Sequence, residues 1–175
     1  MIVRPVDLPG DRASLECLDA SFETDAVYRV ALCGETFRVN LEPVPTMTKV
    51  FTIDDLARPR WQNGWVAIAG GRLVGFVASR YESWNRRVVI WHLYVDRSAR
   101  RCGVGRALLE QALAEGRAQG ARTAWLETQN VNAPAVAAYR AMGFELCGLD
   151  ISLYRSTPAE GEIALFMARS LGPGS

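Results

Sequence analysis

The clearest pattern of apolar and polar positions lies in the middle of the chain. The apolar run Trp65 to Ala69 is followed by Gly70-Gly71 and then by Leu73 to Tyr81. Two β-rich runs about a pair of glycines are typical of antiparallel strands joined by a tight turn. Val88 to Val95 is the next apolar run, and it predicts a third strand of the same sheet.

Helices and strands alternate after this point. Apolar residues recur with helical spacing from about Val104 to Gln119, and Gly120 predicts the end of that helix. A second helix is predicted over Ala133 to Met142, ended by Gly143. The strands predicted around these helices are Ala124 to Thr128, Phe144 to Leu146, Ile151 to Tyr154 and Ile163 to Met167.

The first third of the chain has a weaker pattern. Ile2 to Val6 predicts a short strand, and Ser14 to Phe22 predicts a helix with Leu15, Leu18 and Phe22 on one face. Two β-rich runs, Val27 to Leu32 and Thr36 to Leu41, predict a hairpin about residues 33–35. Prolines at positions 43, 45 and 59 predict a loop, with a short helix at Asp54 to Arg58.

The order of these elements bears on the fold class. Strands come first and then alternate with helices, which favours an α+β fold with a ligand cleft where neighbouring strands diverge. No repeat or low-complexity linker interrupts the sequence. We therefore expect one domain over residues 1–175.

Composition is that of a globular protein. The 175 residues are 49% hydrophobic and 22% charged, enough for one sizeable core. Apolar runs such as 65–69 fall far below the roughly 20 residues that span a bilayer. The N-terminus has no signal-peptide pattern, so we expect a cytoplasmic protein.

Cysteine and histidine usage argues against a metal site. Cys17, Cys33, Cys102 and Cys147 show no C-x-x-C spacing, and His92 is the only histidine. The sequence therefore predicts neither a zinc site nor a disulfide framework. Cys102 lies within an arginine-rich segment, where we expect an oxidisable thiol and not a catalytic one.

Charge is nearly balanced overall but segregated along the chain. The formal net charge is +1 and the single lysine is Lys49, which does not indicate broad nucleic-acid affinity. Residues 71–140 nevertheless carry six more bases than acids, and the segments on either side are net acidic. The middle suits an anionic cofactor and the ends suit a cationic substrate, although an ordinary solvated surface also fits.

An arginine-rich glycine turn links the third strand to the first long helix. It reads Arg100-Arg101-Cys102-Gly103-Val104-Gly105-Arg106. Gly103 and Gly105 permit positive φ angles and the close approach of a phosphate to the backbone. The first turn of the helix adds unpaired N–H groups and partial positive charge. The segment predicts an anion site, with a plain strand-to-helix turn as the alternative.

Two well-known phosphate loops do not fit this segment. A Rossmann turn needs a third glycine three residues after the second, where Leu108 stands. A Walker loop needs Lys-Ser/Thr after the second glycine, which is followed here by Arg106-Ala107. Leu108 therefore excludes a Rossmann dinucleotide site, and Arg106-Ala107 excludes a Walker nucleotide site.

The spacing does resemble the R-x-x-G-x-G acyl-CoA loop of the GNAT superfamily of N-acetyltransferases. Leu93-Tyr94-Val95-Asp96 before it is similar to that family's fourth strand. Asn132 to Phe144 resembles the second signature, with its Asn, Ala, Tyr and Gly-Phe. The resemblance implies a mixed, mostly antiparallel central sheet flanked by helices. It also implies acetyl-CoA as cosubstrate and no metal.

The resemblance also assigns roles to single residues. Tyr139 would protonate the departing thiolate, and His92 is a candidate base because imidazole titrates near neutral pH. A packing aromatic and a core histidine are the alternatives for these two residues. The residues assigned to acetyl-CoA are Leu93, Val95, Arg100, Arg101, Cys102, Gly103, Val104, Gly105, Arg106 and Asn132.

A closer resemblance, over roughly residues 65–170, is to the streptothricin acetyltransferases, which confer antibiotic resistance. It rests on Trp84-Asn85-Arg86, Leu126 to Gln129 and Gly148 to Tyr154. Those enzymes have an acidic pair where this chain has Trp91-His92.

This second resemblance implies an acceptor that is a small cationic amine. Carboxylates and aromatic faces attract ammonium groups, so the expected acceptor-binding residues are Trp84, Glu127, Asp150 and Tyr154. The alternatives are a protein N-terminal or lysine acetyltransferase and a non-catalytic acyl-CoA-binding module. No nucleic-acid or membrane partner is expected, and a homodimer is left open.

Overall fold

The structure is a computed structural model that describes residues 1–53 and 56–172. The chain forms two compact units. Unit 1 contains residues 1–21, 50–126 and those from 170 onward, and unit 2 contains residues 22–49 and 127–169. The single domain expected over residues 1–175 stays a prediction.

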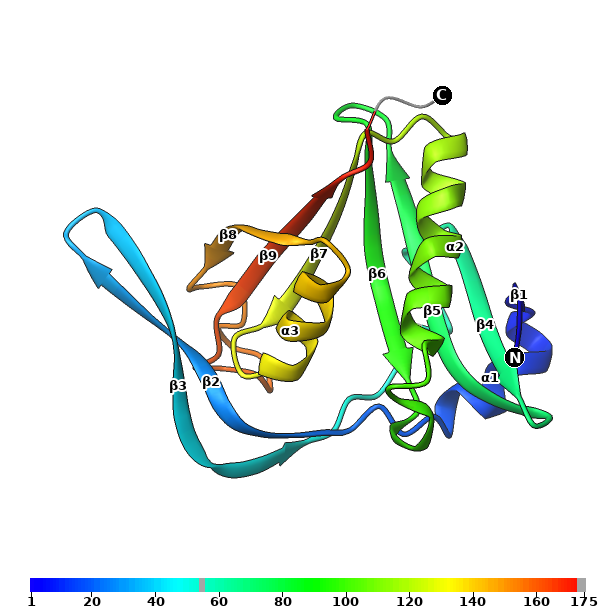
Figure 1. The fold of residues 1–175 in the computed structure, drawn as a ribbon, viewed down its shortest axis with the longest axis horizontal. Coiled ribbons are helices and arrows are strands. Elements are labelled where there is room, and N and C mark those ends of the chain that lie inside the picture. The colour runs from blue at the N-terminus through cyan, green and yellow to red at the C-terminus, as the bar shows by residue number, and fades with distance from the viewer. Residues whose placement is uncertain (54–55, 173–175) are drawn as a thin grey trace. The chain divides into compact units, whose positions relative to one another are not determined.

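Unit 1 is built on a sheet with the strand order β1-β4-β5-β6-β7 (Figure 1). The first four strands pair antiparallel, and β6 pairs with β7 in parallel. This confirms the predicted mixed sheet and the hairpin about Gly70-Gly71, where both glycines have positive φ. The strands are β1 (Ile2–Pro5), β4 (Asn63–Ala69), β5 (Arg72–Glu82), β6 (Arg87–Val95) and β7 (Thr123–Gln129).

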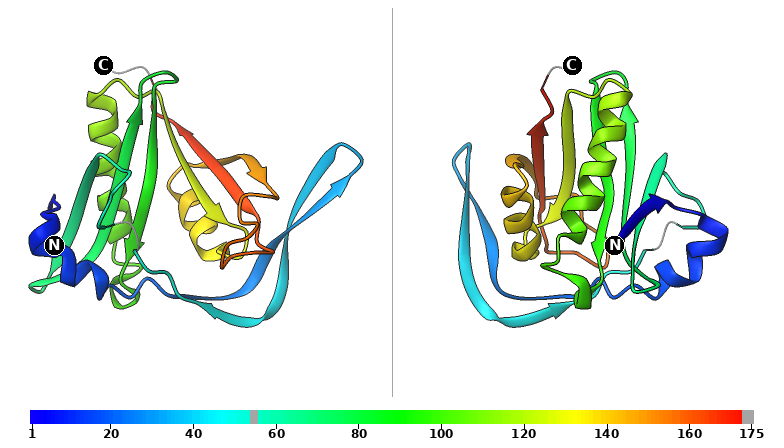
Figure 2. Two further views of the ribbon diagram at one scale, coloured as in Figure 1. Left: turned by 180° about the vertical axis from the view of Figure 1, so that it is seen from behind. Right: turned by 45° about the vertical axis from the view of Figure 1, so that its right-hand side comes forward.

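Helix α2 (Val104–Ala118) covers one face of this sheet (Figures 1 and 2). A Cβ on Gly116 would lie 2.8 Å from the Cβ of Val88, so the absence of a side chain lets helix and strand approach closely. The helix ends before Gly120, which has a φ of +93° as a helix-terminating glycine requires. Its inward stripe of Leu108, Leu109, Ala112 and Leu113 is fully buried.

The opposite face packs on α1 (Leu8–Glu16) and a cluster of Leu15, Leu56, Trp61, Val66, Phe76 and Ala78. The helix predicted at Ser14 to Phe22 is therefore wrong in extent. Pro9 in the first turn favours the earlier start. An ion pair between Arg4 and Asp11, at 2.6 Å, ties that turn to β1.

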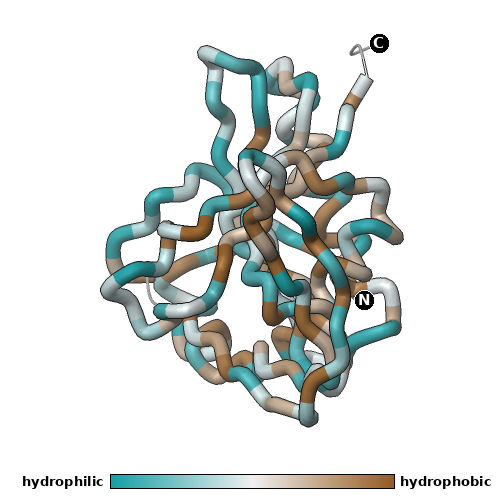
Figure 3. Tube along the Cα trace, turned by 90° about the vertical axis from the view of Figure 1, so that its left-hand side faces the viewer, coloured by the Kyte–Doolittle hydropathy of each residue, from teal (hydrophilic) through white to brown (hydrophobic). Residues whose placement is uncertain are grey.

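Unit 2 contains the hairpin of β2 (Phe22–Cys33) and β3 (Thr36–Lys49), the helix α3 (Ala133–Ala141), and the antiparallel pair β8 (Glu145–Asp150) and β9 (Ala164–Ser170). The end of β7 lies beside β9. Hydrophobic and hydrophilic residues alternate along much of the chain (Figure 3), as strands with one covered face require. The predicted hairpin is confirmed and is longer than expected.

Two predictions in this part of the chain are wrong. Pro43 and Pro45 lie within β3 and not in a loop, because a strand with an open edge tolerates the missing N–H. Ile151 to Tyr154 forms turns and not a strand, since the Asp150 carboxylate accepts hydrogen bonds from the Ser152 amide and hydroxyl. The short helix expected at 54–58 begins on residues 54–55, outside the described residues.

Candidate active site

The loop after β6 has the backbone of an anion site. A 3₁₀ turn, η1 (Arg97–Ala99), follows the strand and is capped by the Asp96 side chain. Arg101 and Gly103 then have φ angles of +62° and +80°. Gly103 stands at the N-cap of α2 with no capping side chain, and Ala107 makes the first intrahelical bond to its carbonyl, at 3.0 Å. The N-terminal turn of a helix is where backbone amides commonly bind an anion.

The charges around this turn suit a phosphate. The first turn of α2 contains no acidic residue, and the backbone at Arg101, Cys102 and Gly103 is exposed. Arg100 is half-buried, and its Nε donates to the Val95 carbonyl at 3.1 Å. Burial lowers the pKa of this guanidinium, which remains cationic at neutral pH.

A β-bulge interrupts the pairing of β6 with β5 within the second half of β6, and the pairing resumes beyond it. Ala78 pairs with His92 and Ser79 with Ile90, so Trp91 is the extra residue. The parallel pairing with β7 ends at the same place, where Ile90 meets Leu126. Leu93 and Val95, assigned to the pantetheine arm, lie beyond the last residue of β6 that pairs with β7, and they remain paired with Val77 and Gly75 of β5.

The bulge also determines where His92 points. Bulged strands redirect side chains, and both Trp91 and His92 face the α1 side of the sheet. The His92 ring lies 6.0 Å from Phe76 and stacks 5.5 Å from Tyr94, between centroids. Trp91 packs on the same core cluster and lies 5.1 Å under the Arg60 guanidinium. His92 is half-buried in an aromatic surface, on the face away from α2.

In unit 2, α3 presents Tyr139 near its end. Asn132 caps the helix by accepting from the Ala135 amide at 3.2 Å, so the residue assigned to acetyl-CoA also has a structural role. The Tyr139 ring is half-buried and lies 6.0 Å from the ring of Phe144. The predicted stop at Gly143 is confirmed by its φ of +84°.

The structure brings Glu127 and Tyr154 together. The Tyr154 hydroxyl donates a hydrogen bond to the Glu127 carboxylate. Glu127 is exposed to solvent as a whole residue, but desolvation of its carboxylate by surrounding protein raises its pKa, and the charge of Glu162 raises it further. Burial and the neighbouring carboxylates also raise the pKa of Tyr154, which stays protonated.

Glu162 adds a second carboxylate near Glu127 and Tyr154. It accepts an ion pair from the ammonium of Lys49, and both side chains are less than one-fifth exposed. The site can thus hold an ammonium group against carboxylates within unit 2. Sequence reasoning missed both residues, because they lie more than a hundred positions apart and neither belongs to a motif.

Two other predicted acceptor residues take no part in the contacts of Glu127 with Tyr154 and of Lys49 with Glu162. Trp84 is 83% exposed in the turn before β6, whereas the anion loop follows the other end of that strand, about 30 Å away for nine extended residues. The Asp150 carboxylate is engaged by Ser152, whose hydrogen bonds lower its pKa. Their binding roles stay predictions.

Asn130 is a buried residue that sequence reasoning also missed. Its side chain donates to the Tyr28 carbonyl at 2.9 Å and accepts from the Ile163 amide at 2.8 Å. Its backbone bonds the same two residues, each at 2.9 Å. Asn130 therefore joins β2 to the start of β9. The only signal in the sequence was that Asn130 comes two residues after the strand predicted at Ala124 to Thr128.

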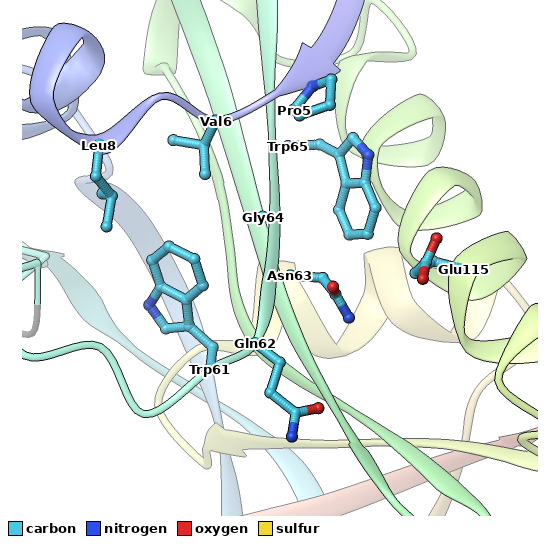
Figure 4. A pocket seen from close by; sticks show the side chains of 9 residues that line it. All are labelled: Pro5, Val6, Leu8, Trp61, Gln62, Asn63, Gly64, Trp65 and Glu115. Atoms are coloured by element: carbon cyan, nitrogen blue, oxygen red, sulfur yellow. The ribbon is translucent and has the colours of Figure 1, made fainter.

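A separate hollow of about 450 Å³ lies in unit 1, by the ends of β1 and β4 (Figure 4). Its lining includes Trp61, Trp65 and, from the later half of α2, Glu115. None of the predicted site residues lines it. Across residues 1–53 and 56–172, no three His, Cys, Asp or Glu side chains are arranged to hold a metal ion.

Together these features define an α+β protein in which a glycine-containing helix N-terminus follows a strand whose pairing with β7 has ended. The sequence profile of the acetyltransferase (GNAT) family matches residues 26–144. The chain belongs to this family and is an N-acetyltransferase by class.

Two relatives are similar to this chain over nearly its whole length, and a third is similar over less than half of it. A streptothricin acetyltransferase of Streptomyces lavendulae is 42% identical over 170 residues, covering 91% of this chain and 90% of that protein. The crystal structure of a nourseothricin acetyltransferase is 44% identical, with a TM-score of 0.89 over 99% of this chain and 98% of the other. The ribosomal protein bS18-alanine N-acetyltransferase of Escherichia coli K12 is 37% identical, but over only 45% of this chain and 53% of that protein.

In the described part of the chain, every helix is too short or too polar to cross a membrane.

Proposed function

We propose that this chain transfers the acetyl group of acetyl-CoA to a primary amine of a small cationic acceptor of the streptothricin type. The observation that carries the proposal is the 42% identity to a streptothricin acetyltransferase over 91% of the chain. The proposed location is the cytoplasm, as expected from the sequence.

Acetyl-CoA would be held largely by backbone. The positive φ of Gly103 and the absence of an acidic residue in the following turn fit a pyrophosphate. The residues that would hold it are the amides of 101–106, with Arg100, Arg101 and Arg106 supplying charge. The backbone of Leu93 and Val95 would bind the pantetheine arm as an added strand does, and Asn132 would complete the site.

Acetyl-CoA supplies the acetyl group as a thioester. The chain must then accept a proton from the attacking amine and return one to the sulfur as the C–S bond breaks. In the proposal Tyr139 holds the phenolic proton for the sulfur, and His92 accepts the proton of the amine. The His92 ring contacts the rings of Phe76 and Tyr94, and these contacts restrain the orientation of the imidazole that would accept the proton.

The acceptor would be recognised by side chains. Glu127 and Tyr154 provide a carboxylate and an aromatic hydroxyl in direct contact, and Asp150 and Trp84 are further candidates. A cationic amine gains charge-assisted hydrogen bonds from such groups. The contact between Lys49 and Glu162 supports the same chemistry, since an ammonium already binds there.

A second candidate is a protein N-terminal acetyltransferase, favoured by the partial similarity to the bS18-alanine enzyme. Steady-state release of free thiol separates the two. We would compare streptothricin, spermidine, an aminoglycoside and a peptide with a free N-terminus and a lysine. The proposal predicts that a small amine has the highest kcat/KM. Far faster turnover of the peptide would overturn it.

A further inference from the structure

Four charged or polar side chains of unit 2 form a cluster from three separate parts of the chain. Glu127 comes from β7, and Lys49 is the last residue of β3. Tyr154 and Glu162 belong to the turns between β8 and β9. The Tyr154 hydroxyl donates to Glu127, and the Lys49 ammonium pairs with Glu162. We call these four residues the carboxylate cluster.

The carboxylate cluster contains more negative than positive charge. Its carboxylates lie close enough to interact, because the charge of Glu162 raises the pKa of Glu127. Partly buried carboxylates that lie near each other are stabilised when each has a cation. Lys49, the single lysine of the chain, pairs with Glu162. The charge of the second carboxylate therefore favours a further cation.

Glu162 has unused capacity to bind a donor. Its Oε1 accepts from Lys49, whereas its Oε2 is buried and has no hydrogen-bond partner among the described residues. The buried Oε1 of Gln129 also has no partner in that part of the chain. Gln129 lies on the same face of β7 as Glu127, because alternate residues of a strand share a face. Both unpartnered atoms are acceptors, which suits a donor such as an ammonium group.

Glu162 is held by its backbone, whereas the ammonium of Lys49 is carried on a flexible stem. The Glu162 amide donates to the Ala159 carbonyl at 3.0 Å, and the amide of Ile163 donates to the Asn130 side chain at 2.8 Å. The side chains of Lys49 and Glu162 are 19% and 18% exposed, so solvent reaches the ion pair. The ammonium can therefore leave while the carboxylate stays in place.

We propose that Glu162 binds a non-reacting ammonium group of the acceptor, and that Lys49 occupies this place until the acceptor displaces it. The inference rests on the proposed function, to which it adds a binding residue and a class of acceptor. An ammonium held against a carboxylate keeps its proton, and a protonated amine has no lone pair to attack a thioester. The group at Glu162 is therefore not the one acetylated, so the acceptor carries more than one amino group.

A purely structural ion pair is the alternative, and it predicts a different response. If the pair only holds β3 against the turns, removing Lys49 weakens the fold and does not improve acceptor binding. If Lys49 competes with the acceptor for Glu162, removing it improves acceptor binding. The direction of the change in KM separates the two.

Steady-state thiol release with streptothricin tests the competition. Lys49→Ala removes the competing ammonium and should lower the KM for streptothricin about tenfold. Lys49→Arg supplies a guanidinium that can bind a carboxylate at two points, and should raise this KM about tenfold. An unchanged or higher KM in Lys49→Ala would overturn the inference. So would an unchanged KM in Lys49→Arg, as expected of a structural cation.

The matched control is Arg29→Ala. It removes an exposed ion pair of the same hairpin, between Arg29 and Glu42 at 3.8 Å, and should leave the KM for streptothricin at the wild-type value. Circular dichroism verifies the fold of each variant. If Lys49→Ala does not fold, the KM of Lys49→Arg decides the question.

Thermal unfolding without acetyl-CoA gives a second readout, because no acetyl transfer can then occur. Lys49→Ala lacks the end of the lysine side chain, and n-propylammonium replaces the missing atoms. We expect n-propylammonium chloride to raise the Tm of this variant by about 2–4 °C over an equal concentration of sodium chloride. It should not raise the Tm of Arg29→Ala, or of Lys49→Ala combined with Glu162→Gln. No rise in Lys49→Ala would overturn the assignment of Glu162.

The two assays separate failure of the inference from failure of the proposed function. If the wild type releases no thiol with any amine, the proposed function fails, and the Tm of Lys49→Ala in n-propylammonium still decides whether Glu162 binds an ammonium group. If the wild type acetylates streptothricin and Lys49→Ala shows no lower KM, the inference alone fails.

Discussion

The anion loop of unit 1 and the Glu127–Tyr154 contact of unit 2 differ in the groups that form them: backbone in the loop and side chains in the contact. The loop is defined by its backbone, with Arg101 and Gly103 at positive φ immediately before the first turn of α2. The acceptor candidates are side chains, and their properties depend on burial and on neighbours such as Glu162. One region is encoded locally and the other by long-range contacts.

This difference predicts how each region responds to substitution. Most side chains in the loop can change without loss of its amides, whereas a change at its glycines alters the backbone itself. In unit 2 each carboxylate contributes individually, so removing one changes affinity and pH dependence in a graded way. Substitutions in the loop should therefore have larger effects than substitutions among the carboxylates.

Gly103→Glu should abolish acetyl-CoA binding, measured by calorimetry. The φ of +80° strains any side chain, and a carboxylate there would repel a pyrophosphate. Gly71→Glu is the matched control, since Gly71 has a φ of +75° and a Cβ at either glycine would meet no atom within 4 Å. Equal affinity in the Gly103 variant and the wild type would show that the loop does not bind the cosubstrate.

Tyr139→Phe should lower kcat by about 100-fold or more and leave acetyl-CoA affinity nearly unchanged, because only the transferable proton is removed. The ring would still pack on Phe144. Phe144→Leu, a change to the ring's neighbour, serves as a control for packing. An unchanged kcat in Tyr139→Phe would make this residue structural.

Asn130→Ala should destabilise the fold by about 2–4 kcal/mol in urea unfolding, because the Tyr28 carbonyl and the Ile163 amide lose their partners in a buried place. Asn40→Ala, on the exposed polar side of the hairpin, should stay within about 0.5 kcal/mol of the wild type. Equal stability of both variants would contradict the role of Asn130 in joining β2 to β9.

Glu127→Gln should raise the KM for the amine acceptor about tenfold, the loss of one charge-assisted hydrogen bond. The KM for acetyl-CoA should not change, because the proposed binding of acetyl-CoA uses the backbone of the loop and not the Glu127 carboxylate. The control is Glu160→Gln, which alters an exposed carboxylate of the same unit. An equal rise in the KM for the amine and in the KM for acetyl-CoA would contradict the separate roles of the two regions.

The smallest effect concerns pH. The raised pKa of Glu127 means that the folded chain holds this proton more tightly than the unfolded chain. Its contribution to stability is therefore complete at low pH and is lost as pH rises from the ordinary glutamate range through the raised value. The Tm of the wild type should fall relative to that of Glu127→Gln across this window. A constant difference in Tm would contradict the raised pKa.

Sequence reasoning succeeded where structure is encoded locally. The hairpin at Gly70-Gly71, the helix ended by Gly120 and the helix ended by Gly143 all follow from glycine chemistry and apolar spacing. The loop from Arg100 to Arg106 was located in the same way. These features need only a few neighbouring residues to specify them.

The remaining features depend on distant parts of the chain. The bulge at Trp91 is visible only in the register of β6 against β5, and it redirects His92. The helix α1 begins earlier than expected because its first turn is held by Arg4 through Asp11. The contact of Glu127 with Tyr154 spans 27 positions, so the sequence identified both residues without showing that they meet.

The most direct test of the account is mass spectrometry of streptothricin after incubation with acetyl-CoA and the purified chain. The account predicts a product heavier by one acetyl group on an amine, one free CoA thiol for each product, and a much slower reaction with Tyr139→Phe. Tight binding of acetyl-CoA without transfer to streptothricin or any other amine would contradict it, and would leave a non-catalytic acyl-CoA-binding protein.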